Sequence, residues 1–179
     1  MSLIITIKPN EVYNEDTNEF IKVGGGTIEL EHSLVALSKW EAKHHKNFIN
    51  NKDLTSEEML DYFKCMIIGD APKNFEYGLT QENVDKITKY ILDPMSATKF
   101  YKNNVKKTDE KITSELIYYW MIAQNIPVQF ENWHLNRLIT LIRLCSVKQE
   151  KPKKMSQQDI LKQNAKINAA RRAKLHSKG

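Results

Sequence analysis

The apolar residues of this chain change their spacing at residue 32, and this change constrains the fold more than any other feature. Before it, they fall in three short β-branched runs at Leu3–Lys8, Phe20–Val23 and Thr27–Glu31, which is typical of strands. From His32 to Val147 they recur every three or four positions, which is the spacing of helices. We therefore predict an α+β fold, mainly α, with a small N-terminal antiparallel β-sheet and a compact five-helix body.

Turn residues separate the three predicted strands. Pro9 ends the first run, the range Tyr13–Glu19 is rich in turn formers, and Gly24–Gly26 precedes the third run. A run of glycines can hold a phosphate, but this one lacks the Lys-Ser/Thr pair of a P-loop. A flexible hairpin link is therefore the better interpretation of the glycines.

Local start and stop signals bound several of the predicted helices. Thr55 and Glu58 have the spacing of a capping box, so a helix begins there. Another begins near Thr80 and stops at Asp93–Pro94, because proline removes a backbone donor and restricts the residue before it. The range 113–125 is apolar nearly all round, which predicts a helix in the centre of the core.

The positive charge of the chain lies in its last 32 residues. The chain has a formal net charge of +5, and Lys148–Gly179 alone carries ten basic and two acidic residues. The first 147 residues are therefore slightly acidic, and any argument for nucleic-acid binding depends on the end of the chain. We predict a globular domain over 1–147, with strands in 1–31 and helices in 32–147, and a basic, partly helical or disordered C-terminal arm over 148–179.

Cysteine content and hydropathy indicate a soluble protein of a reducing compartment. Cys65 and Cys145 both lie in apolar stretches and are interpreted as buried thiols, because two widely spaced cysteines do not make a disulfide framework. The apolar run of Met1–Ile7 is too short for a secretory signal. No stretch approaches the roughly 20 apolar residues of a membrane span.

The residues offer little catalytic chemistry. His134 and Arg137 share a predicted helix, and Glu115 or Glu131 could complete an acid–base pair, but a buried polar cluster that fixes helix packing is the stronger interpretation. His44 and His45 point about 100° apart on a helix and do not converge on one metal ion. We therefore expect no enzymatic activity, no metal and no cofactor.

Several blocks of the chain resemble a family of small proteins from the structural-gene modules of long-tailed bacteriophages. They span nearly the whole chain in order, and the resemblance includes no catalytic residue. The blocks are Leu30–Glu41, Thr113–Ala123, Trp133–Leu138, Pro152–Ser156, Asn168–Arg172 and Lys178–Gly179.

The resemblance implies a tail assembly chaperone, which binds the tape-measure protein and keeps its hydrophobic helices soluble during tail assembly. Such a protein acts in the cytoplasm of the infected bacterial host. Its expected partners are the tape-measure protein or other tail proteins, and a homo-oligomer is a further possibility. The first alternative is a structural virion protein of the neck or tail. The second is a nucleic-acid-binding phage protein that acts through its basic arm, where no aromatic residue is available to stack on bases.

Exposed aromatic and basic residues are the natural candidates for contact with a partner. We expect such contacts from the body and from the arm. The candidate partner-binding residues are Trp40, Trp133, His134, Arg137, Lys153, Lys154, Arg171 and Arg172.

Overall fold

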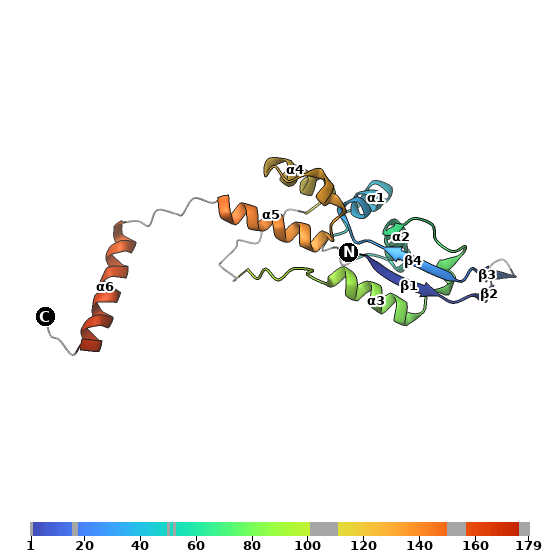
Figure 1. Ribbon diagram of the computed structural model, residues 1–179, viewed down its shortest axis with the longest axis horizontal. Coiled ribbons are helices and arrows are strands. Elements are labelled where there is room, and N and C mark those ends of the chain that lie inside the picture. The colour runs from blue at the N-terminus through green and yellow to red at the C-terminus, as the bar shows by residue number, and fades with distance from the viewer. Residues whose placement is uncertain are drawn as a thin grey trace. The chain divides into compact units, whose positions relative to one another are not determined.

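A computed structural model describes residues 2–15, 18–49, 51, 53–100, 111–149 and 157–175 of the chain. Its internal contacts divide the chain into two units, Met1–Ser146 and Val147–Gly179. The first unit contains antiparallel N-terminal strands followed by helices, and helix α6 (Gln157–Leu175) lies in the second (Figure 1). The prediction of an α+β fold that is mainly α is confirmed at this level.

The strands form two small antiparallel sheets. Strands β1 (Leu3–Ile7), β4 (Gly26–Leu30) and β5 (Ile67–Ile68) make one sheet in the order β1-β4-β5, and β2 (Asn10–Asn14) pairs with β3 (Glu19–Val23) in a hairpin. The predicted turn over 13–19 is therefore too long, because its first residues belong to β2. The hairpin continues beyond the end of β1 and β4 in Figure 1.

One face of the three-stranded sheet enters the hydrophobic core. Ile5 and Ile7 of β1 and Ile28 and Leu30 of β4 are all buried, while the residues between them are exposed or half-buried. This alternation is the expected pattern for a sheet that packs on helices with one face. Close packing continues to Gly78, where a Cβ atom would lie 2.7 Å from side-chain carbons of Ile7 and Val23. A side chain larger than hydrogen does not fit there.

The helices of the first unit follow the predicted signals closely. Each of the first four is capped by a Ser or Thr side chain that accepts a backbone N–H bond, namely Ser33, Thr55, Thr80 and Thr113. Two short 3₁₀ helices, η1 (Phe75–Gly78) and η2 (Val128–Asn132), join them. The helices are α1 (Leu34–His44), α2 (Ser56–Cys65), α3 (Gln81–Leu92), α4 (Ser114–Ala123) and α5 (Leu135–Gln149).

Removing the capping box of α2 tests the local part of this description. The Thr55 hydroxyl accepts a bond from the Glu58 N–H, and the Glu58 carboxylate accepts one from the Thr55 N–H. Thr55→Ala removes the first bond, so we expect a loss of about 1 kcal/mol in the free energy of unfolding. Urea denaturation measures this loss, and Ser56→Ala, on the next exposed position, serves as the matched control with a smaller change.

Helix α4 does not occupy the centre of the core, so that prediction is wrong. Its buried residues are Ser114, Ile117 and Met121, whereas Tyr119 and Ile122 are 64% and 76% exposed. The core is instead centred on α1 and α2, where Trp40 and Tyr62 are fully buried. A helix that is apolar on all sides therefore need not lie in the centre of the core, because one side of α4 faces solvent.

Candidate partner-binding site

The candidate site is the outward face of α4, formed by Leu116, Tyr119, Ile122 and Ala123. These residues recur at helical spacing on the side opposite Ile117 and Met121, and they are exposed or half-buried. Glu115 is the only charged residue on α4; it is exposed and, four residues before Tyr119, lies at the N-terminal end of the same face. A helix surface with this composition is typical of a face that binds another apolar surface.

Buried polar contacts fix the N-terminal end of α4 to the rest of the unit. Glu41 of α1 is buried, and its carboxylate accepts bonds from the N–H of Ser114 at 2.7 Å and from the N–H of Phe48 at 3.3 Å. At the other end, the Gln124 side chain donates to the Ser146 hydroxyl at 2.7 Å. The outward face is therefore held on a helix that is anchored at both ends.

A stack of aromatic side chains lies beside α4. The Tyr118 hydroxyl donates to Glu131 of η2 at 2.8 Å, and burial together with this carboxylate raises the pKa of Tyr118 to about 12. The rings of Phe130 and Trp133 stack at 4.1 Å, and the Arg137 guanidinium lies 4.1 Å from the Trp133 ring centre. The Tyr118 bond joins α4 to Glu131, which follows Phe130 in η2.

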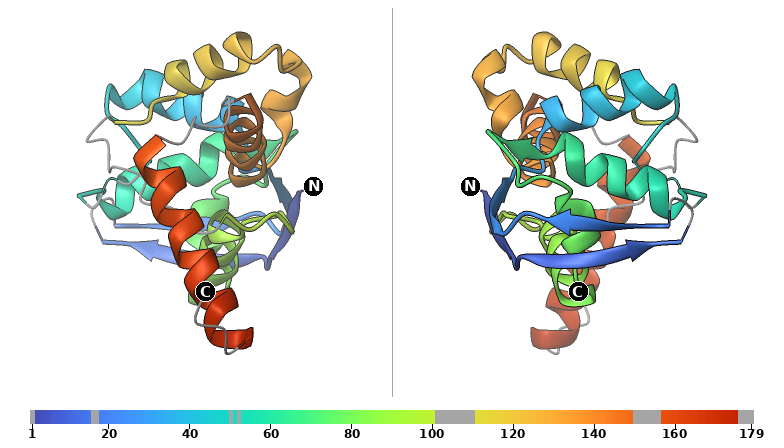
Figure 2. Two further views of the ribbon diagram at one scale, coloured as in Figure 1. Left: turned by 90° about the vertical axis from the view of Figure 1, so that its left-hand side faces the viewer. Right: turned by 90° about the vertical axis from the view of Figure 1, so that its right-hand side faces the viewer.

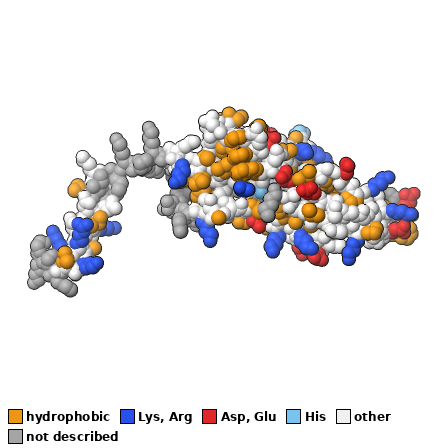
Figure 3. Space-filling view, in the orientation of Figure 1, with side chains coloured by type: hydrophobic (Ala, Val, Ile, Leu, Met, Phe, Trp, Pro, Cys, Tyr) orange, Lys and Arg blue, Asp and Glu red, His pale blue; other side chains and the backbone are white. Residues whose placement is uncertain are grey.

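Arg137 adds a positive charge to this stack. Its side chain is exposed, and no carboxylate of the described residues forms an ion pair with it. The ring of Trp133 holds the guanidinium in place, which lowers the entropy that Arg137 loses when it binds a carboxylate. Figure 3 shows hydrophobic side chains gathered over α4 and α5.

The predicted residues fall into two groups in the first unit. Trp133 is half-buried and Arg137 exposed, and both lie in the stack beside α4. Trp40 and His134 are buried in the core instead, and the Trp40 indole N–H donates to the Glu58 carbonyl at 2.8 Å. Sequence reasoning missed Tyr119 and Ile122, although a ten-residue helix that is apolar on all sides was the signal that could have found them.

His134 belongs to a buried cluster with His32. Its Nε2–H donates to the Tyr90 carbonyl at 2.9 Å, and the two imidazole rings lie 4.9 Å apart, edge to face. His32 Nδ1 bonds to the Tyr62 hydroxyl at 2.6 Å. Burial, and then the neighbouring His134, lowers the pKa of His32 to about 3, and burial also lowers the pKa of His134. Both imidazoles are therefore neutral at pH 7, and this cluster fixes helix packing, whereas Arg137 lies outside it.

The remaining predicted residues lie towards the end of the chain. Lys153 and Lys154 fall outside the described residues. Arg171 and Arg172 are exposed on α6, where the basic residues are distributed around the helix and all described side chains are exposed. The described apolar side chains of α6, among them Leu161 and Ile167, are exposed as well.

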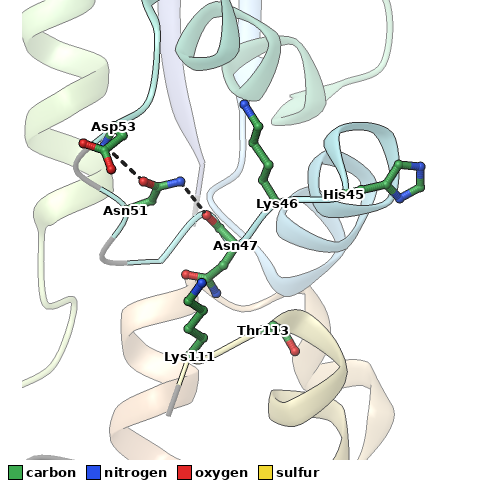
Figure 4. A pocket seen from close by; sticks show the side chains of 7 residues that line it. All are labelled: His45, Lys46, Asn47, Asn51, Asp53, Lys111 and Thr113. Atoms are coloured by element: carbon green, nitrogen blue, oxygen red, sulfur yellow. Dashed lines mark hydrogen bonds between the residues drawn. The ribbon is translucent and has the colours of Figure 1, made fainter. Parts of the chain in front are cut away.

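A pocket lined by polar side chains lies near the N-terminus of α4. It measures about 730 Å³, and Figure 4 shows Asn47, Asn51 and Lys111 around it while His45 points away. The asparagines already serve the loop, because Asn47 donates to the Ile112 carbonyl and Asn51 donates to the Asn47 carbonyl at 3.0 Å. These hydrogen bonds stabilise the loop, and the residues that line the pocket do not bring catalytic groups together.

No cluster of three or more His, Cys, Asp or Glu side chains within the described residues could hold a metal ion. None of the described helices combines the length and the hydropathy needed to cross a membrane. A comparison with protein-family models, curated proteins and solved structures finds no match.

Proposed function

We propose that this protein is a non-catalytic tail assembly chaperone of a long-tailed bacteriophage and that it binds apolar helices of the tape-measure protein. The observation that carries the proposal is the outward face of α4. A short helix held by Glu41 and Gln124 presents Tyr119 and Ile122 to solvent, which costs free energy unless a partner covers them. The partner's identity comes from the family resemblance of the sequence.

Binding would follow the helix-in-groove mode. An amphipathic helix that lies along α4 would cover Leu116, Tyr119, Ile122 and Ala123 with its own apolar stripe. Fully burying a large apolar side chain contributes roughly 1.5–3 kcal/mol, so a few such contacts give reversible rather than permanent binding. Reversibility is what a chaperone needs, because the tube protein must displace it.

Charged residues would supply a second contact. Arg137 stacks on Trp133 and would pair with an acidic residue of the partner. Helix α6 carries five basic residues and one acidic residue, so this helix would hold an acidic segment of the partner. The arm also supports the nucleic-acid alternative, which predicts binding that weakens steeply with salt.

Two measurements on infected cells separate the chaperone from the structural alternative. This protein is used to capture partners from the lysate, and purified virions are analysed by mass spectrometry. A chaperone captures the tape-measure protein and is absent from the particle. Stoichiometric presence of this protein in the virion would contradict the proposal and favour a neck or tail component.

A further inference from the structure

The hydrogen-bonding direction of β1 follows from that of β4. The Glu31 N–H donates to the Met66 carbonyl at 2.8 Å, so the main chain of Glu31 points towards β5. Since successive residues of a strand point to opposite sides, Ile28 and Leu30 point towards β1. They are paired with Ile5 and Leu3. The N–H and C=O groups of Ile4 and Thr6 therefore point away from the sheet.

These outward groups form an open edge. No hydrogen bond within the described part of the chain reaches the main chain of Ile4 or Thr6, and the Ile4 side chain is 66% exposed. Leu3–Ile7 contains no charged residue and no proline. Proteins usually protect an edge strand with such features, and here they begin only at Lys8 and Pro9, beyond the strand.

A pocket lies beside this edge. It has a volume of about 310 Å³ and lies between Ile4 and Thr6 of β1 and Asn83 and Lys86 of α3. Helix α3 runs alongside β1 in Figure 1. Figure 2 shows the same elements end-on, from the left and the right side of Figure 1. A strand added to β1 would direct alternate side chains towards this pocket.

We propose that the edge of β1 binds an extended peptide segment of another protein as an additional strand. The segment exchanges main-chain hydrogen bonds with Ile4 and Thr6, as in other cases of β-strand addition. The surface is separate from the outward face of α4, and the proposal does not depend on the function proposed above.

The surroundings of the edge specify the chemistry of the segment. Ile4, which is exposed and also lines the pocket, favours a β-branched or aromatic cross-strand neighbour. In the same pocket Glu82 forms an ion pair with Lys86 at 2.7 Å, and Lys8 interacts with Glu82 only through its charge, with no ion pair of its own among the described residues. The segment therefore alternates apolar and polar residues and carries an acidic residue near Lys8.

Selection from a random heptapeptide display library on the full chain tests the proposal. We expect enriched peptides with this alternation and an acidic residue, and micromolar binding of the synthetic peptides. Amide exchange by NMR gives the decisive pattern, in which the bound peptide protects the N–H groups of Ile4 and Thr6. The N–H groups of Leu3, Ile5 and Ile7 are already bonded within the sheet and change little. Protection that does not alternate would refute strand addition.

Three variants test the surface, with Thr6→Ser as the matched control. Thr6→Pro removes an outward donor that the monomer does not use, so it should raise the peptide dissociation constant at least about tenfold, while Thr6→Ser should leave it nearly unchanged. Lys8→Glu should weaken acidic peptides by several-fold without any change to the strand. Equal binding to wild type, Thr6→Pro and Lys8→Glu would overturn the proposal, as would self-association through β1 with no peptide enriched.

Discussion

Replacing Glu41 by alanine is expected to lower the free energy of unfolding by about 3–4 kcal/mol, because two buried N–H groups lose their acceptor. The Glu41 carboxylate accepts from Ser114 at the start of α4 and from Phe48 after α1, and the side chain is only 7% exposed. Alanine fills none of this space and accepts no bond. Urea denaturation followed by circular dichroism measures the change.

Glu57→Ala is the matched control for this prediction. Glu57 is an exposed glutamate in the first turn of α2, and we expect its replacement to change stability by less than about 1 kcal/mol. Equal effects of the two substitutions would mean that Glu41 does not anchor α4. Glu41→Gln keeps one acceptor oxygen and should lie between them.

Mild acid is expected to destabilise the protein through the buried histidines. His32 has a folded-state pKa of about 3, below the ordinary value of 6.5. The unfolded chain therefore binds a proton that the folded chain does not, so the contribution is fully present above about pH 6.5 and is lost as the pH falls. Between pH 7 and pH 5 we expect a loss of about 2 kcal/mol from His32. His134, whose pKa is also lowered, adds to the loss.

Urea denaturation at several pH values measures this loss. His32→Gln removes the titrating group, so this variant should be less stable at pH 7 because the Tyr62 contact changes. Its stability should nevertheless depend less on pH between 7 and 5. An identical pH dependence in wild type and variant would assign the acid sensitivity to other groups.

Much of the local structure could be predicted from the sequence because its causes are local. Thr55 and Glu58 cap α2 through their own backbone neighbourhood, and Asp93–Pro94 ends α3 because proline restricts the residue before it. The spacing of Leu34, Leu37 and Trp40 identified the buried face of α1. Each of these signals acts within a few residues.

Other features depend on contacts between distant residues and could not be predicted in this way. Strand β2 contains few strand formers and exists because it pairs with β3. Glu41 lies 73 residues from its partner Ser114, and no local pattern indicates that pair. The apolar sequence of α4 suits a core helix and a binding helix equally well, so only the packing of its neighbours distinguishes them.

The most direct test of the central claim is co-expression of the tape-measure protein with this protein. Wild type should keep the tape-measure protein soluble and co-purify with it, whereas Tyr119→Glu/Ile122→Glu should do neither, because two charges then occupy the outward face of α4. The control is Phe20→Glu, which charges a residue of similar exposure, 69%, on the β2–β3 hairpin. Circular dichroism confirms that each variant is folded. The predicted result is that the tape-measure protein becomes insoluble with the α4 variant alone. A soluble tape-measure protein that co-purifies with the α4 variant would contradict the proposed site.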